Sequence, residues 1–301
     1  MKRFSISKKF GFLSLALALA SPAAARADCG PEALGVSRVI EIDRAHGAAV
    51  GLQTYPRTLD LNDHEVVLTF DDGPADTTER VLSALAKECA RATFFIIGQN
   101  AENMPGMVKR TAAEGHSIAH HSYSHPAKTL RLMSEAAAKA DIDKGIAAVT
   151  KAAGGTAAPF FRFPGFADTP ELVADLLARG YTVFGSDLWA SDWSQMTPKA
   201  ELDLVLSRLE KTGKGIVLFH DSQSITAQML PDFLRELKKR GYKLVHIVPG
   251  DGPTPIAEAG PGWTSTTEPI IAKTLSKYTG GKDKAATQPQ APAPANGDHT
   301  H

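Results

Sequence analysis

Short apolar runs alternate with longer segments of helical periodicity between residues 66 and 248 of this chain. The apolar runs have the length and the β-branched and aromatic content of buried strands. They predict seven strands, at residues 66–70, 92–97, 116–121, 160–163, 182–186, 215–220 and 242–247.

In the segments between these strands, apolar residues recur every three or four positions, as on the buried face of a helix. Several segments end in glycine shortly after a basic residue, as helices commonly do. Helices are predicted at residues 77–90, 107–115, 134–154, 169–180, 199–213 and 229–241. Because strands that alternate with helices form parallel neighbours, we expect one α/β domain, either a barrel or a doubly wound sheet.

The alternating pattern defines this domain at residues 64–250 and does not extend to its flanks. We expect residues 28–63 to form an irregular N-terminal extension. Residues 251–301 are expected to form a loop-like to disordered tail, because they are rich in proline and alanine. No contribution to the core is expected beyond about residue 255.

Residues 1–27 have the pattern of an export signal, with a basic start, an apolar stretch too short to span a bilayer and a small-residue end. We therefore expect a periplasmic or secreted monomer without a membrane span once the signal is removed. Removing the five basic residues of the signal from the 33 in the whole chain leaves 28 against 33 acidic residues, a net charge of −5. Such a charge does not predict a nucleic-acid partner.

Two cysteines, Cys29 and Cys89, are present in the sequence. Export permits a disulfide between them. The helical pattern around Cys89 instead favours a buried thiol that packs as a small apolar residue.

Polar side chains suited to catalysis gather at the carboxyl ends of the predicted strands. The carboxyl ends of parallel strands meet at one edge, where the sites of α/β folds lie. In chain order, these residues are Asp71, Asp72, His121, His125, Arg162, Asp187, His220 and Asp221.

His121 and His125 stand four residues apart, a spacing that places two imidazoles on one face of a helical turn. Such a pair can bind zinc or another divalent ion, although it also occurs without one. Asp72 could supply a third ligand. Because neighbouring residues on a strand point to opposite faces, Asp71 would then remain free.

A divalent ion would lower the pKa of a bound water and polarise a substrate carbonyl. Asp71 could then act as the general base, with Arg162 orienting it and keeping it ionised. His220 is suited to protonate a leaving nitrogen. Asp187 is the acid expected to favour its imidazolium form, whereas Asp221 would face away.

These residues lie in five segments that resemble, in order, the motifs of the polysaccharide deacetylases with a NodB-homology domain, also called carbohydrate esterase family four. The segments are TFDDG, HSYSH, FRFPGF, SDLWASDW and VLFHD. The resemblance covers roughly residues 64–248. It implies a distorted (β/α) barrel, an acetylated glycan as substrate and one divalent metal, usually zinc and sometimes cobalt or nickel.

The resemblance also implies roles for single residues. Asp71 would be the base and His220 the acid, with Arg162 placed against the base. The metal ligands would be Asp72, His121 and His125, and the acetyl pocket would be lined by Leu218 and Trp193.

The chain departs from the family pattern in two of the five motifs. In the third, Phe163 and Gly165 replace a proline and a tyrosine, although the backbone N–H of Gly165 would still serve an oxyanion. In the fourth, Trp189 stands where the acid that tunes the histidine usually lies. We therefore expect Asp187 to take that role through a local bulge, with Asp192 as the alternative.

Other functions fit parts of the pattern. Two histidines and a carboxylate also describe a non-haem iron oxygenase, but Asp71, Arg162 and His220 would have no use there. A glycan-binding protein without turnover is a third hypothesis. The sequence does not identify the glycan, which could be peptidoglycan, a chitin oligosaccharide, poly-N-acetylglucosamine or acetylated xylan.

Overall fold

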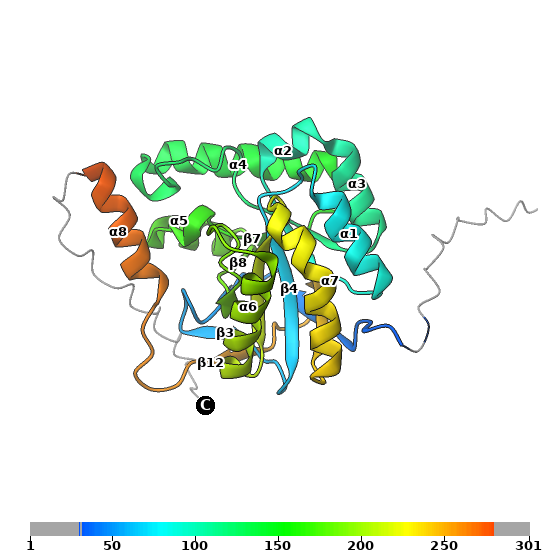
Figure 1. The fold of residues 1–301 in the computed structure, drawn as a ribbon. Helices are drawn as coiled ribbons and strands as arrows, with labels where there is room; N and C mark the ends of the chain where they lie inside the picture. The colour runs from blue at the N-terminus through cyan, green and yellow to red at the C-terminus, as the bar shows by residue number, and fades with distance from the viewer. Residues whose placement is uncertain (1–29, 31, 280–301) are drawn as a thin grey trace, which may run out of the picture.

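The computed structural model describes residue 30 and residues 32–279. The predicted signal at residues 1–27, Cys29 and the end of the predicted tail at residues 280–301 lie outside the described residues. Within them, all seven predicted strands and all six predicted helices are present (Figure 1).

Ten strands form one sheet in which every pairing is parallel, as expected. They are β1 (Arg38–Asp43), β2 (Ala49–Val50), β4 (Glu65–Asp71), β5 (Thr93–Ile96), β6 (Ser117–His120), β7 (Phe160–Phe161), β8 (Thr182–Phe184), β9 (Leu188–Trp189), β10 (Gly215–His220) and β11 (Lys243–Gly250). A second sheet pairs β3 (Arg57–Leu59) antiparallel with β12 (Ile256–Glu258).

The large sheet curves into a distorted barrel, and β4 is one of the central strands of that sheet (Figure 1). Every residue of β4 is buried, as is typical of a parallel strand covered on both faces. β4 pairs with β5, β10 and β11, and its register with β10 sets Asp71 opposite His220. The fold thereby brings residues from distant parts of the chain to one end of the barrel.

Helices cover the outside of the barrel (Figure 1). α7 shows why, because its buried residues recur at helical spacing and join the main hydrophobic core. The helices are α1 (Thr78–Lys87), α2 (Gly98–Asn103), α3 (Pro105–Ala113), α4 (Glu135–Ala152), α5 (Pro170–Ala178), α6 (Pro198–Thr212), α7 (Ser224–Lys239) and α8 (Thr267–Thr279), with 3-10 turns η1 (Leu130–Leu132) and η2 (Pro164–Phe166).

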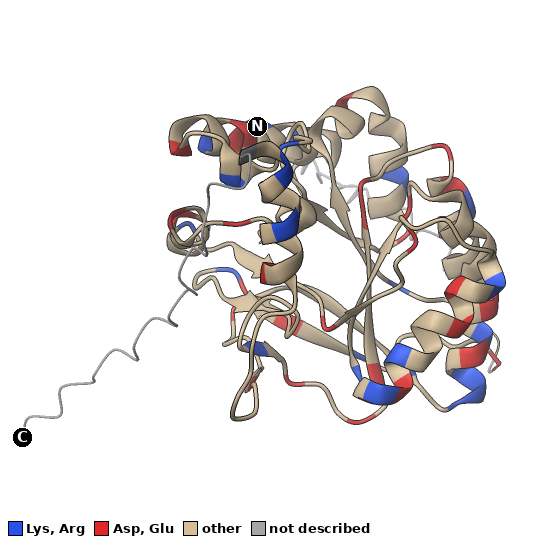
Figure 2. Ribbon diagram, turned by 60° about the vertical axis from the view of Figure 1, so that its left-hand side comes forward, with Lys and Arg blue, Asp and Glu red and all other residues tan. Residues whose placement is uncertain are grey.

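The surface of these helices carries both signs of charge, with acidic and basic residues interspersed along them in Figure 2. Among the described residues, no helix combines the length and the apolar content that crossing a bilayer requires.

Both flanking segments differ from their prediction. In the segment predicted as an irregular extension, the described residues 32–63 form three paired strands, because β1 pairs with β11, β2 with β8 and β3 with β12. Residues 251–279 are not a loop-like tail, because they form β12 and α8. The sequence signal failed here because these strands are only two to six residues long and owe their order to partners far along the chain.

The C-terminal segment is tied to the barrel by polar contacts. Trp263 donates its indole N–H to the carbonyl oxygen of Leu52 at 2.8 Å. Glu268 of α8 pairs with Arg131 at 2.6 Å, and Arg131 also pairs with Asp168, just after η2. α8 therefore supports the loop that contains Gly165.

Ile271→Ala is expected to lower the free energy of unfolding by about 2–5 kcal/mol, because Ile271 of α8 is only 3% exposed and its removal leaves a cavity. The adjacent Ile270 is 53% exposed, so Ile270→Ala is a matched control that should change stability by about 0.5 kcal/mol or less. Denaturant unfolding of the two variants measures both values. Equal, small effects would mean that α8 does not pack on the barrel.

Cys89 is disulfide-bonded, so the expectation of a buried free thiol is wrong. Cys89 lies just past the end of α1 at a positive φ of 48° and is only partly buried. Local helical periodicity predicted the burial of an apolar side chain and carried no information about a covalent partner.

Candidate metal centre and catalytic site

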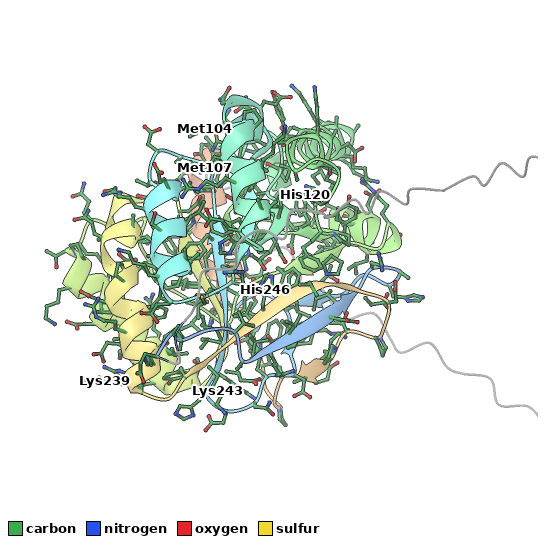
Figure 3. All side chains as sticks on the ribbon, turned by 90° about the vertical axis from the view of Figure 1, so that its right-hand side faces the viewer. Met104, Met107, His120, Lys239, Lys243 and His246 are labelled. Atoms are coloured by element: carbon green, nitrogen blue, oxygen red, sulfur yellow. The ribbon has the colours of Figure 1, made fainter. Side chains whose placement is uncertain are left out.

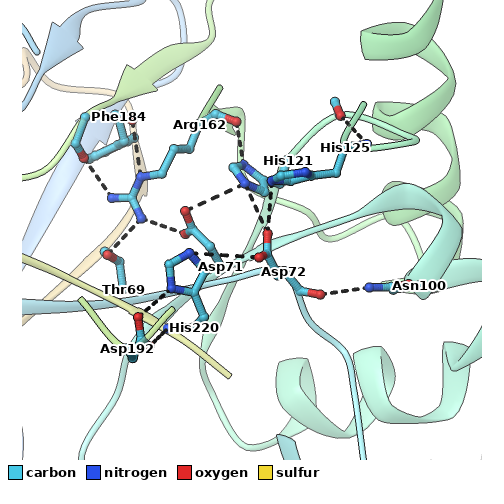
Figure 4. A network of polar contacts seen from close by, with 12 residues as sticks. Thr69, Asp71, Asp72, Asn100, His121, His125, Arg162, Phe184, Asp192 and His220 are labelled. Atoms are coloured by element: carbon cyan, nitrogen blue, oxygen red, sulfur yellow. Dashed lines mark hydrogen bonds and ion pairs between the residues drawn. The ribbon is translucent and has the colours of Figure 1, made fainter. Parts of the chain in front are cut away.

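The two adjacent acids, Asp71 and Asp72, diverge where β4 ends (Figure 4). Asp71 is the last residue of the strand and is almost fully buried. Asp72 follows with a positive φ of 71°, and its carbonyl oxygen accepts a hydrogen bond from the side chain of Asn100 at 2.8 Å. The chain turns between them, so each carboxylate faces a different set of partners.

Asp71 is paired with Arg162, as expected (Figure 4). Nη1 of Arg162 donates to Oδ1 of Asp71 at 2.7 Å and to the hydroxyl of Thr69 at 2.9 Å. The guanidinium is fully buried and also donates to the carbonyl oxygens of Phe184 and Gly185. Burial lowers the pKa of Arg162, and the carboxylate of Asp71 opposes that shift. Arg162 therefore fixes one oxygen of Asp71 and leaves the other facing the site.

Asp72 lies against the two predicted histidines. Its Oδ1 is 3.4 Å from Nε2 of His121 and 3.5 Å from Nε2 of His125. Burial raises the pKa of Asp72, but the facing imidazoles of His121, His220 and His125 outweigh it and hold the pKa well below its ordinary value.

These three residues fit a divalent metal. Their ligand atoms lie within 4.8 Å of one another, and the buried Oδ1 of Asp72 has no hydrogen-bond partner among the described residues. Ligands bound tetrahedrally to zinc at about 2.0–2.2 Å are themselves about 3.3–3.6 Å apart, which matches the separations from Asp72. The donor set of two imidazoles and one carboxylate suits zinc, cobalt or nickel.

The tautomer of His121 is set by its other nitrogen. Nδ1 lies 2.7 Å from the carbonyl oxygen of Arg162, which can only accept, so Nδ1 carries a proton and Nε2 is the nitrogen left to bind a metal. The adjacent His120, labelled in Figure 3, ends β6, and its ring contacts the ring of Tyr181 edge-on. Burial lowers the pKa of His120 to about 3, so it remains neutral and outside the site.

His121 and His125 do not share a helical turn, and that expectation is wrong. Residues 121–125 form a loop in which Ser122 and His125 have positive φ angles of 59° and 45°. The hydroxyl of Ser122 accepts from the backbone N–H of His125 at 3.1 Å, and Asp141 of α4 accepts from the N–H of Tyr123 at 3.0 Å. Side-chain acceptors therefore hold the two imidazoles together.

His220 is held by Asp192, not by Asp187 (Figure 4). One oxygen of Asp192 lies 2.8 Å from Nδ1 of His220, and the other accepts from its backbone N–H at 2.6 Å. Burial lowers the pKa of His220, but Asp192, with Asp72 and Asp71, overcomes it and raises the pKa to about 9. Nε2 of His220 lies 3.9 Å from Asp72, so its proton faces the metal centre.

The preference for Asp187 as the tuning acid is therefore wrong. The backbone N–H of Asp187 donates to the carbonyl oxygen of Ile216. Ile216 lies four residues before His220 on β10, so about 13 Å of strand separates the two residues. Its carboxylate accepts from the N–H groups of Leu52 and Ile216 and from the hydroxyl of Thr58, each at 2.8 Å. Asp187 joins the N-terminal segment to β10.

Two residues behind Asp192 were not predicted. Thr226 donates its hydroxyl to Asp192 at 2.6 Å, and Glu201 lies 3.3 Å beyond that hydroxyl. Glu201 is fully buried, and burial raises its pKa to about 8. Thr226 interrupts the apolar face of α7, and Glu201 interrupts that of α6. These interruptions are the sequence signal that could have identified both residues.

The remaining predicted residues lie around this centre. Leu218 is buried two residues before His220, on the same face of β10. Trp193 is 52% exposed and meets the ring of His220 edge-on at 5.5 Å. Gly165 is exposed in η2 with a φ of 60°. Asp221 points away, as expected, and its carboxylate accepts from Thr78 of α1 at 2.5 Å.

Comparison with known proteins identifies similar chains. A family model described as polysaccharide deacetylase matches residues 58–184. A chitin deacetylase of Colletotrichum lindemuthianum is 30% identical, over 60% of this chain and 77% of its own length. A peptidoglycan-N-acetylglucosamine deacetylase of Bacillus cereus is 30% identical, over 58% of this chain and 66% of its own length. A corresponding enzyme of Listeria monocytogenes is 33% identical, and the chain covers 38% of it. The chain thus spans less than two thirds of the last two relatives.

Solved structures show the same similarity. A peptidoglycan deacetylase of Bdellovibrio bacteriovorus superposes with a TM-score of 0.64 and 34% identity, over 71% of this chain and 59% of that one. A family 4 carbohydrate esterase of Streptomyces lividans, solved with acetate, has a TM-score of 0.55 and 29% identity, over 66% of this chain and 99% of that one.

Proposed function

The chain belongs to the polysaccharide deacetylase family, and from that premise we propose that it is a metal-dependent hydrolase that removes N-acetyl groups from an extracytoplasmic glycan. The observation that carries the proposal is the division between the two adjacent acids at the end of β4. Asp71 is held by Arg162, whereas Asp72 faces two imidazoles. His220 lies close to Asp72, with its own carboxylate partner.

Asp72, His121 and His125 would hold the divalent ion, which we propose to be zinc. When bound, such an ion polarises the acetyl carbonyl and lowers the pKa of water. Asp71 would accept a proton from the attacking water through its free oxygen. His220 would donate its Nε2 proton to the leaving nitrogen as the C–N bond breaks, which yields acetate and a free amine. The backbone N–H of Gly165, with Leu218 and Trp193 as pocket walls, would receive the acetyl group.

Three candidate glycans carry N-acetyl groups, namely peptidoglycan, chitin oligosaccharides and poly-N-acetylglucosamine, whereas a fourth, acetylated xylan, carries the acetyl group as an O-linked ester. The names of the relatives favour the first two. Peptidoglycan lies outside the cytoplasm, in agreement with the export signal predicted at residues 1–27.

Acetate release from these four polymers tests the proposal. We expect release from at least one N-acetylated polymer, loss of that release after dialysis against a chelator and recovery when Zn²⁺ is added back. Full activity in metal-free protein would refute the metal-dependent mechanism. Absence of release from all four polymers, with metal bound, would favour a glycan-binding protein without turnover.

A further inference from the structure

Three aromatic rings form a row that leads away from His220. The ring of Trp193 meets His220 at 5.5 Å between centroids, Trp189 follows Trp193 at 6.2 Å, and Phe166 follows Trp189 at 6.1 Å. Trp193 is exposed, and Trp189 and Phe166 are only partly buried. The row is thus in contact with solvent and starts at the catalytic histidine.

The backbone holds these rings in place. Trp189 belongs to β9, which pairs with β10, and its carbonyl oxygen accepts from Arg208 at 2.6 Å. The same nitrogen of Arg208 donates to the hydroxyl of Ser191, which lies between Trp189 and Trp193 in the sequence. Phe166 has a φ of 58°, and its backbone N–H bonds to Phe163 at 2.9 Å. The surface is therefore preorganised, which reduces the conformational entropy that a ligand would cost.

Other exposed large apolar side chains among the described residues do not adjoin the reacting groups in this way. Besides Trp193, the exposed large apolar residues in the described part of the chain are Val39 on β1 and Ile270 and Tyr278 on α8. An apolar surface that begins at an acid and a metal centre suits a ligand with an apolar face and polar edges. A pyranose ring has this character, because its C–H groups form the face and its hydroxyls the rim.

We propose that Trp189 and Phe166 form a stacking subsite for the sugar units next to the one that loses its acetyl group, so that the enzyme selects chains over single sugars. The inference rests on the proposed function, because the glycan must place one acetyl group at the metal centre. The two residues stand at departures from the family motifs, Trp189 in place of an acid and Phe166 beside the glycine that replaces a tyrosine.

Calorimetric titration of the metal-loaded full chain with monomeric and tetrameric N-acetylglucosamine tests the subsite, with all variants made in an Asp71→Asn background that keeps the metal ligands and suppresses turnover. Trp189→Ala and Phe166→Ala should each weaken binding of the tetramer roughly tenfold, which corresponds to about 1.4 kcal/mol. Binding of the monomer should change by less than about twofold. Trp189→Phe should restore most of the affinity and guards against misfolding of the alanine variant. Val39→Ala, at a side chain that is also 52% exposed, is the control and should leave both affinities unchanged.

Two outcomes would overturn the subsite: unchanged affinity for the tetramer in both alanine variants, or an equal loss for monomer and tetramer. Acetate release by the metal-loaded parent is measured beside these titrations. Failure of release with the binding pattern intact would count against the deacetylase alone. Intact release without the binding pattern would count against the subsite alone.

Discussion

Asp71→Asn is expected to retain the metal and to lose roughly 10²–10⁴-fold in turnover, the usual contribution of a general base. The amide cannot accept the proton of the attacking water. Asparagine has nearly the same shape as aspartate, and its carbonyl oxygen can still accept from Arg162, which donates to Oδ1 of Asp71 at 2.7 Å. The fold and the metal ligands should therefore be preserved.

The matched variant is Asp72→Asn, one residue further along the chain. It replaces the carboxylate that lies 3.4 Å and 3.5 Å from the two imidazoles, so the metal content should fall, and turnover with it. Metal analysis beside turnover number, at saturating and at limiting zinc, separates the two variants. Added zinc should partly restore Asp72→Asn and should leave Asp71→Asn inactive. If both variants lose metal equally, the proposed division of roles is wrong.

Asp192→Asn is expected to move the alkaline limb of the pH–rate profile to lower pH and to reduce turnover by roughly 10²-fold or more. Asp192 is the main interaction that raises the pKa of His220 to about 9, against the lowering effect of burial. As the pH rises through that value, the imidazolium loses the proton that the leaving nitrogen needs, so the rate falls. Without the carboxylate, the proton is lost at lower pH.

The control for this prediction is Asp187→Asn, at the acid that the sequence favoured. Its carboxylate accepts three hydrogen bonds that join the N-terminal segment to β10, so the amide should cost about 1–3 kcal/mol of folding free energy. The alkaline limb of the remaining activity should stay in place. A shifted limb in Asp187→Asn and an unshifted one in Asp192→Asn would reverse the two roles.

Much of the architecture follows from local patterns. The seven central strands and six helices were predictable because each carries its own periodicity, and a parallel sheet follows from their alternation. The short strands β1, β2, β3, β9 and β12 and the helices α2 and α8 were missed. Their order depends on partners elsewhere in the chain, such as Arg131 for Glu268 of α8.

Within the candidate site, the sequence by itself determined which residues could meet at the ends of β4, β6 and β10, because strand ends in a parallel sheet share one edge. It also predicted that Asp71 and Asp72 diverge, although they do so at the turn after β4, where Asp72 has a φ of 71°, and not along the strand. Asp72, His121 and His125 were brought together as predicted, although in a loop and not on a helix.

Only the tertiary structure decided which carboxylate serves His220. Asp187 and Asp192 are five residues apart in one motif, and the pairing of β9 with β10 places the first beside Ile216 and the second beside His220. The contact of Phe166 with Trp189 and the position of Glu201 behind Asp192 depend equally on long-range register and loop path. Hydrophobic periodicity reports the face on which a side chain lies, whereas its partner is set by elements that the local sequence does not contain.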